Sequence, residues 1–260
     1  MEWIDEAILL SARPHGETAA IVTLLTLQHG RHAGLVQGGQ GRSKQSLLQP
    51  GNHVKARWRA RLLDHLGNYS LEVVTSHAAP WFDHPEVLSI IASACAITEA
   101  ALPERQPMPG VYAGLRALLG WPDPELWAPA YVKWETELLR ALGFGLDLSQ
   151  CAATGTTENL SHVSPRTGRA VSREAATPYK DKLFKLPAFL CGMAEEWTME
   201  DIVNGLDMTG HFLTRHVFAH NHGRAPGSHD LPPARERLGE FYRKIANNWA
   251  ENEKVLKKAL

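Results

Sequence analysis

Apolar and polar residues alternate in short runs over the first 80 residues of the chain. Runs of this kind, separated by turn residues, cover residues 3–12, 18–27, 33–37, 54–62 and 69–76. A period of two is typical of β-strands that bury one face, and β-branched residues favour the same structure. Strands of this length and spacing predict a small β-barrel.

From residue 81 onward the apolar residues recur at steps of three and four, which is the spacing of amphipathic helices. Stretches of this kind cover residues 87–102, 109–119, 124–142, 187–197, 199–206, 209–220 and 233–260. In the last stretch, the apolar residues from Leu238 to Trp249 predict a buried stripe. Residues 147–178 are an irregular insert rich in Thr, Ser, Gly and Arg. We therefore predict an α+β protein, with an OB-fold domain at residues 1–80 and an α-helical domain at residues 81–260.

The composition is that of an ordinary globular protein, with 44% hydrophobic residues, 21% charged residues and a formal net charge of −1. No segment approaches the roughly 18 consecutive apolar residues that a membrane helix requires. The acidic start, from Glu2 to Glu6, lacks the positive charge of a signal peptide. The 3 cysteines are widely spaced, which argues against a disulfide framework. These features predict a cytoplasmic protein that does not contact a membrane.

Residues 31–61 are strongly basic, although the whole chain is not. This stretch contains no Asp or Glu, and its cations are Arg31, Arg42, Lys44, Lys55, Arg57, Arg59 and Arg61. In a strand at 54–62, the last four of these share one face and Trp58 lies on the other. A row of like charges repels itself, and a nucleic-acid backbone supplies the missing counter-charge. The Gly-rich loop at 38–44 would bring Arg42 and Lys44 to the same backbone. We therefore predict a DNA-binding face.

Other interpretations of the basic row remain open. Cations on an edge strand can simply guard it against strand addition. The row could also bind acidic protein segments, which would make the chain a scaffold, or serve a metal-dependent nucleic-acid enzyme. Only Trp3, Trp58 and Tyr69 are available for base stacking in the barrel, and Trp58 is expected in the core. DNA binding should therefore be mainly electrostatic and tolerant of sequence.

The sequence contains no recognisable catalytic or cofactor motif. A P-loop starting at Gly34 fails, because Gly39-Gln40-Gly41 stands where Gly-Lys-Ser/Thr is needed. A metal is suggested only by the histidines His211, His216, His220 and His222. His216 and His220 are one helical turn apart, but no carboxylate or cysteine has zincin spacing. We expect no catalytic residue, no cofactor and no metal.

Several segments together resemble the RecO family of DNA repair proteins, the recombination mediators, over essentially the whole chain. They are residues 38–44, Leu-Gln-Pro-Gly at 48–51, Leu-Gly-Phe-Gly-Leu-Asp-Leu at 142–148, Val-Ser-Pro-Arg-Thr-Gly at 163–168 and Leu-Pro-Pro-Ala-Arg at 231–235. The resemblance implies an OB-fold and a helical domain. It also implies ATP-independent annealing of complementary strands and help in loading RecA onto single strands coated by SSB. The partners implied are single- and double-stranded DNA, RecR, SSB and, indirectly, RecA, so the protein would lie at the nucleoid.

The chain departs from the family pattern in the insert. Many members carry a four-cysteine zinc knuckle there, and the matching residues are Cys151, Thr154, Ser172 and Ala175. Structural zinc needs four ligands, so we expect a degenerate, zinc-free knuckle.

A second concentration of cations lies in and after this insert. Its members are Arg166, Arg169, Arg173, Lys180, Lys182 and Lys185, and the apolar pair Leu183-Phe184 lies among them. A cationic rim beside an apolar slot suits an acidic peptide with an aromatic end. The family resemblance makes the SSB C-terminal tail the leading ligand. A solvated loop and a continuation of the DNA path are the alternatives.

Overall fold

The structure is a computed structural model that describes residues 1–192, 196–219 and 230–259. It forms two compact units, Met1–Trp127 and Ala128–Leu260. The first helices of the chain therefore group with the strands that precede them. The division that we expected at residue 80 stays a prediction.

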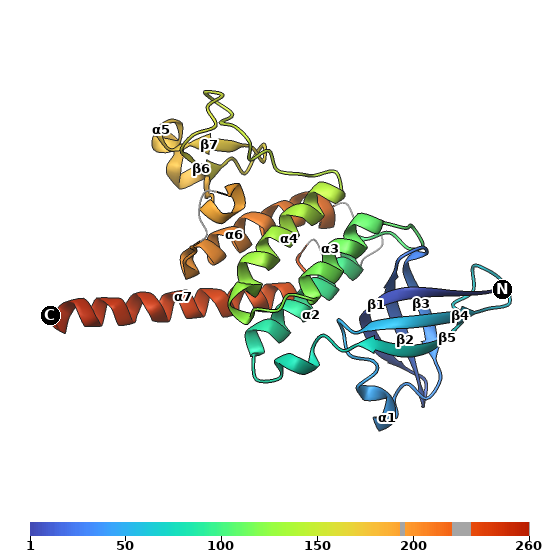
Figure 1. Ribbon diagram of the computed structural model, residues 1–260. Coiled ribbons are helices and arrows are strands. Elements are labelled where there is room, and N and C mark those ends of the chain that lie inside the picture. Colours follow the sequence, from blue (N-terminus) through green and yellow to red (C-terminus); the bar gives the residue numbers. More distant parts are fainter. Residues whose placement is uncertain (193–195, 220–229, 260) are drawn as a thin grey trace. The chain divides into compact units, whose positions relative to one another are not determined.

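The first unit is built on a closed β-barrel (Figure 1). Its strands are β1 (Glu2–His15), β2 (Ala19–Thr26), β3 (Gly30–Val36), β4 (His53–Arg59) and β5 (Asn68–Thr75). The order around the barrel is β1-β2-β3-β5-β4, and β3 pairs with β5 in the parallel sense while the other pairs are antiparallel. The predicted OB-fold barrel is confirmed. Its core includes Trp58, which is fully buried as predicted.

The Gly-rich loop at 38–44 is tied to the barrel and ends in a helical turn. The Gln40 side chain donates hydrogen bonds to the carbonyls of Gly16 and Ala19, both at 2.9 Å. The one-turn helix α1 (Arg42–Gln45) follows directly. A single amide side chain thus ties this segment to the turn between β1 and β2.

Helices complete the first unit. They are the 3-10 turn Ala79–Trp81, α2 (Pro85–Ala101), α3 (Pro109–Leu119) and the 3-10 turn Pro124–Leu126. Helix α2 packs on β1, and its Glu99 accepts hydrogen bonds from Ser11 at 2.8 Å and Thr23 at 3.1 Å. A carboxylate on the helix therefore fixes it to the barrel.

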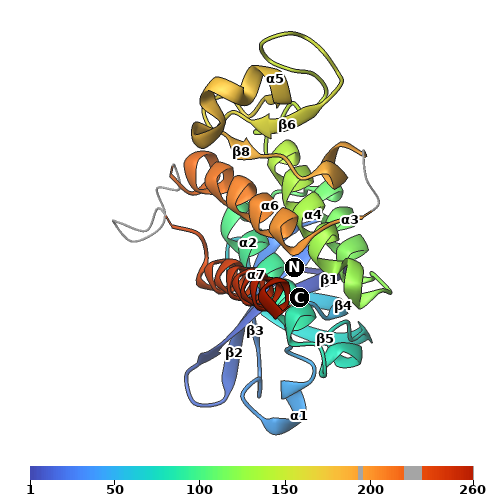
Figure 2. The same ribbon diagram turned by 90° about the vertical axis from the view of Figure 1, so that its left-hand side faces the viewer.

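The second unit contains helices and a small sheet. Its longer helices are α4 (Trp127–Ala141), α6 (Met199–Phe212), which continues as a π-helical segment at Leu213–Phe218, and α7 (Pro233–Ala259). The insert and the residues after it form β6 (Leu160–Val163), β7 (Ala170–Ser172), α5 (Arg173–Ala176), the 3-10 turn Thr177–Lys182 and β8 (Phe184–Lys185). The strand order is β7-β6-β8, and β8 contacts α6 (Figure 2). Of the helix expected at 187–197, the described part is a 3-10 turn, Ala188–Cys191.

A buried ion pair joins α4, α6 and α7. Arg235 at the start of α7 donates to both carboxylate oxygens of Glu135 on α4, at 2.6 and 2.9 Å. Thr209 on α6 and Tyr131 also donate to Glu135. The predicted stripe of α7 is buried at Leu238 and Tyr242, but Trp249 is 67% exposed. Our expectation of a stripe buried along its whole length was therefore wrong at Trp249.

Candidate nucleic-acid interface

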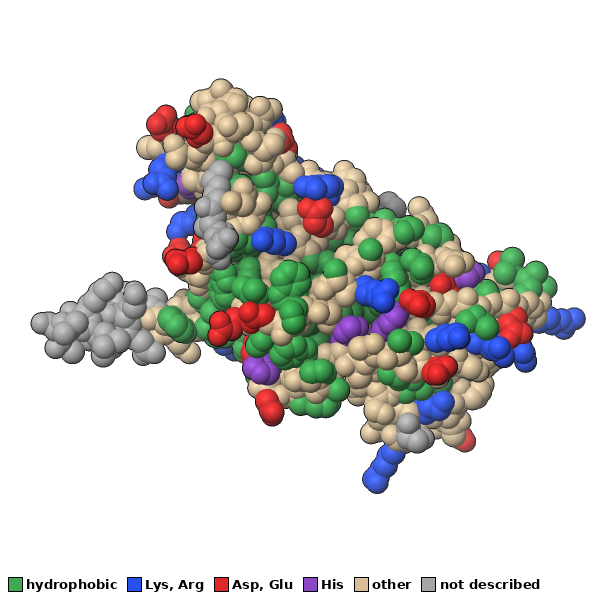
Figure 3. Space-filling model, viewed as in Figure 1, with side chains coloured by type: hydrophobic (Ala, Val, Ile, Leu, Met, Phe, Trp, Pro, Cys, Tyr) green, Lys and Arg blue, Asp and Glu red, His purple; other side chains and the backbone are tan. Residues whose placement is uncertain are grey.

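Three cations of the basic row lie on the outer side of the barrel. Lys55, Arg57 and Arg59 on β4 are exposed, while the residues between them point into the core. We call these three the basic face. Arg61 is also exposed but lies beyond the end of the strand. In Figure 3, blue side chains gather over the barrel strands, with red ones between them.

Strand β4 is not an edge strand, because it pairs with β1 on one side and β5 on the other. Its cations therefore do not protect a free edge, and that interpretation of the row was wrong.

Neighbouring strands supply carboxylates that the β4 sequence lacks. The register places Glu2 opposite Arg59, and both Glu6 and Glu72 opposite Lys55. The Glu2 carboxylate lies 3.3 Å from Nε of Arg57 and 2.9 Å from a guanidinium nitrogen of Arg59. The hydrogen bond from Arg59 lowers the pKa of Glu2. These groups are exposed, and ion pairs of this kind contribute little to stability.

The other predicted DNA contacts do not gather at this face. Arg42 on α1 is exposed and Lys44 is half-buried. Their segment is tied to the far end of β1, whereas Arg59 pairs with Glu2 at its start. A strand of 14 residues spans on the order of 40 Å. The structure therefore separates Arg42 and Lys44 from Arg59 along the barrel.

Arg31 has a structural partner that its sequence neighbours do not reveal. Its Nε donates to the carbonyl of Leu102 at 2.8 Å, and its guanidinium lies 3.5 Å from the Glu104 carboxylate. This half-buried side chain links β3 to the segment that follows α2.

The cations of the insert are dispersed. Arg166 is in the β6–β7 turn, Arg173 is on α5, and Arg169 is paired with Asp147 at 3.2 Å. A hollow of about 490 Å³ brings Lys180 and Lys185 together with the apolar pair. Its lining residues are His162, Lys180, Asp181, Leu183, Phe184, Lys185, Asn204 and Asp207. Two of the six predicted cations thus border a slot.

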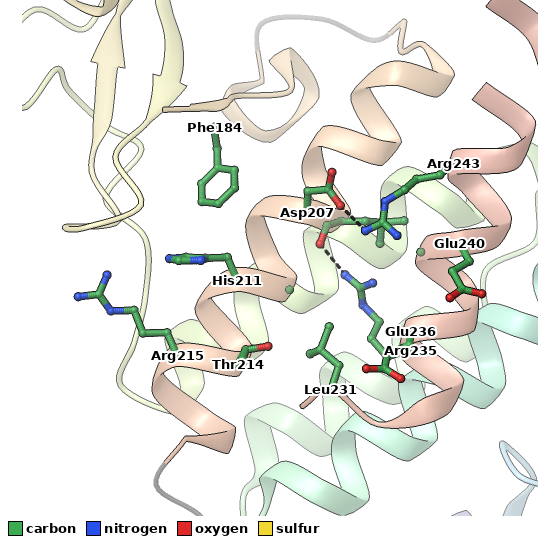
Figure 4. A pocket seen from close by; sticks show the side chains of 13 residues that line it. Phe184, Asp207, His211, Thr214, Arg215, Leu231, Arg235, Glu236, Glu240 and Arg243 are labelled. Carbon is green, nitrogen blue, oxygen red and sulfur yellow. Dashed lines mark hydrogen bonds and ion pairs between the residues drawn. The ribbon is translucent and has the colours of Figure 1, made fainter. Parts of the chain in front are cut away.

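A larger hollow of about 720 Å³ adjoins it between α6 and α7, sharing Phe184 and Asp207 with the first (Figure 4). Phe184 lies over His211, with ring centroids 5.1 Å apart. Across the hollow, Arg243 binds Asp207 at 2.6 Å. The floor is formed partly by Arg235 of the buried ion pair. The wall is therefore aromatic on one side and charged on the other.

The residues at the knuckle positions do not fit zinc. Cys151 is buried, and its sulfur accepts a hydrogen bond from the Ser172 amide at 3.2 Å. Burial raises the pKa of Cys151, but hydrogen bonds from Ser172 and Thr154 outweigh it and lower the pKa to about 6. Two former ligand positions thus bind the remaining sulfur, and Ala175 offers no donor atom to a metal.

The two histidines of the predicted set that the structure describes, His211 and His216, have other partners. His211 hydrogen-bonds to the Pro165 carbonyl at 3.1 Å, and the His216 ring stacks on Phe144. His220 and His222 lie outside the described residues. Within the described residues there is no group of three or more side chains that could hold a metal. Nor does any described helix have the length and apolar character of a membrane span.

Comparison with known proteins covers nearly the whole chain. The family models described as Recombination protein O N terminal and Recombination protein O C terminal match residues 1–77 and 84–225. The DNA repair protein RecO of Rhodospirillum centenum is 52% identical over 246 residues, which are 94% of this chain and 96% of the relative. The RecO protein of Phenylobacterium zucineum is 49% identical, with 92% and 98% covered. With this agreement in both halves, the chain belongs to the RecO family.

Proposed function

We propose that the chain is a recombinational-repair mediator that binds single- and double-stranded DNA through its barrel and works without ATP. The RecO family acts in DNA repair and recombination. The observation that carries the proposal is the outward row of Lys55, Arg57 and Arg59, continued by Arg61. These side chains recur about every 6.6 Å along the strand, so each can neutralise a separate phosphate.

Annealing follows from the same contacts. Two complementary strands repel each other through their phosphates, and a cationic surface that neutralises one strand lowers this repulsion. No nucleotide hydrolysis is needed for such a step. With RecR, the protein would then help to load RecA onto strands coated by SSB.

The acidic C-terminal tail of SSB is the partner that we propose for the second unit. The ammonium groups of Lys180 and Lys185 border the hollow beside β8, and Leu183 and Phe184 supply an apolar wall. Lys185 is ion-paired with Glu200 at 2.5 Å, so the tail would have to compete with that carboxylate. The other four predicted cations do not line this hollow and would attract the tail only from a distance. They are Arg166, Arg169, Arg173 and Lys182. A tail with several carboxylates and an aromatic end matches both parts of this hollow.

Annealing of complementary oligonucleotides without ATP tests the function. Wild-type protein should accelerate annealing of both naked and SSB-coated strands. The double variant Arg57→Glu/Arg59→Glu should not. As a control, Arg237→Glu/Lys244→Glu makes the same charge change at exposed positions of α7 and should anneal normally. Equal annealing by a folded Arg57→Glu/Arg59→Glu protein would contradict the proposal, and magnesium-dependent cleavage of labelled DNA would instead indicate an enzyme.

A further inference from the structure

The loop between β4 and β5 presents two leucines to solvent. Leu62 is 53% exposed and Leu63 is 57% exposed. They directly follow Arg61, and Arg59 and Arg61 are themselves exposed. An apolar tip thus adjoins the end of the basic row.

The backbone of this loop is held in place from both sides. Arg105 donates to the carbonyls of Leu63 at 2.8 Å and His65 at 3.3 Å. Trp58 in the core donates to the carbonyl of Leu66 at 2.9 Å. Gly67 packs so closely on Trp58 that a Cβ there would lie 2.4 Å from the indole nitrogen. The two leucines are therefore exposed on a braced backbone.

The brace itself adopts an unfavourable conformation. Arg105 has a φ of 58°, in the left-handed region that non-glycine residues rarely occupy. Its amide donates to the Arg31 carbonyl at 2.8 Å, and the Arg31 side chain holds the Leu102 carbonyl in return. Arg31 is thus linked through Arg105 to the position of the leucines. A strained residue that supports an exposed loop suggests that the loop has a function.

We propose that Leu62 and Leu63 contact the unpaired bases of single-stranded DNA whose phosphates lie over Arg59 and Arg61. This inference rests on the proposed function. A single strand combines an anionic backbone with apolar base faces, and leucine is one of the side chains that proteins insert between base steps. Trp58 and Tyr69 are buried in the barrel interior, and the half-buried Trp3 ring is already stacked on His29 and Trp58. Asp64 beside the leucines lies 3.6 Å from Arg105, which offsets its charge.

The experiment measures the affinity of the wild-type protein and of two variants of the full chain for two ligands. The ligands are a single-stranded oligonucleotide and an abasic oligonucleotide of the same length. The test variant is Leu62→Ser/Leu63→Ser, and the control is Phe82→Ser, which removes the most exposed large apolar side chain of the described residues, at 72%. Affinity is measured by fluorescence anisotropy, and thermal melting checks that each variant is folded.

The leucine variant should bind the normal oligonucleotide roughly tenfold more weakly and the abasic one with unchanged affinity. Wild-type protein should also raise the fluorescence of a 2-aminopurine base by unstacking it, and the leucine variant should not. Phe82→Ser should match wild type in every measurement.

Unchanged binding of the normal oligonucleotide by the folded leucine variant would overturn the inference, and so would an equal loss on both ligands. These outcomes leave the proposed function intact if Arg57→Glu/Arg59→Glu still abolishes binding. Failure of the wild-type protein to bind either ligand would overturn both.

Discussion

The barrel and the insert both carry clusters of cations, but only strand β4 of the barrel keeps its cations together. On β4, alternate residues emerge on the same side, so the spacing of Lys55, Arg57 and Arg59 in sequence becomes a spacing in space. In the insert, Arg166 and Arg173 lie in a turn and a short helix, and only Lys180 and Lys185 border a hollow. A charge cluster in sequence therefore indicates a surface reliably only where regular structure fixes its direction.

The largest effect is expected from substitutions in the basic face. Arg57→Glu/Arg59→Glu should weaken DNA binding by roughly a thousandfold or more, because two attractive contacts become repulsive. With about four phosphates neutralised, the wild-type log–log dependence on salt should have a slope of roughly −3 on single strands. Anisotropy titrations over a range of salt measure both values. Near wild-type affinity in the folded variant, or a slope near zero in wild type, would contradict this prediction.

The interior of the barrel should respond to acid. In the barrel, burial, followed by the charges of Arg105 and His29, lowers the pKa of His32 to about 4. The unfolded chain therefore takes up a proton near pH 6.5 that the folded chain refuses until about pH 4. Stability should be complete above pH 6.5 and fall between pH 6.5 and 4, by up to about 3 kcal/mol at 1.36 kcal/mol for each pKa unit.

Urea unfolding at several pH values measures this loss. A His32→Asn variant should be less stable at neutral pH, since it loses the hydrogen bond with Tyr69, but flatter in its pH dependence. The exposed His15 provides the control, and His15→Gln should leave the wild-type curve unchanged. If the free energy of unfolding of His32→Asn falls with pH as steeply as that of wild type, the acid sensitivity comes from other histidines.

Within the insert, position at the hollow should matter more than charge alone. Lys180→Glu/Lys185→Glu should weaken binding of an acidic tail peptide about tenfold, because both residues border the hollow. Arg166→Glu/Arg173→Glu changes the charge equally but should have a smaller effect. Removing the terminal aromatic of the peptide should also reduce binding to wild type. If the two variants lose affinity equally, the peptide is attracted by the overall positive charge of the insert, and the hollow beside β8 is not its binding site.

The smallest effect is expected at the knuckle. Purified protein should contain no stoichiometric zinc, and chelators should leave the melting temperature unchanged, because hydrogen bonds to Cys151 replace the metal. Elemental analysis and thermal melting with EDTA check this. About one zinc per chain would refute the prediction and direct attention to the histidines near His216.

The sequence predicted the barrel and the direction of the β4 side chains because both depend on local alternation. It could not predict Glu2 and Glu72 opposite Arg59 and Lys55, since that requires the register of three strands. The partners of Arg31 were missed for the same reason, as Leu102 is remote in sequence. Alternation in β1 could have indicated Glu2 and Glu6 as neighbours of the row once the barrel order was known.

The helical unit was predicted less completely. Apolar spacing located α4, α6 and α7, because their buried faces follow the helical period. The same spacing could not show that Trp249 is exposed. An apolar stripe predicts which face of a helix is buried, but not how much of the helix length is covered by neighbouring elements. The short strands of the insert were missed because strands of two to four residues leave little periodicity to detect.

The ion pair between Glu135 and Arg235 has a consequence for how this sequence can change. Both groups are almost completely buried, and neither can lose its partner without leaving an isolated charge, which destabilises a protein by about 3–5 kcal/mol. Replacing both by apolar residues that pack well is far less harmful. The two positions are 100 residues apart in sequence, yet substitutions at one should be accompanied by substitutions at the other. In diverged relatives, the carboxylate and the guanidinium should be inherited together or lost together.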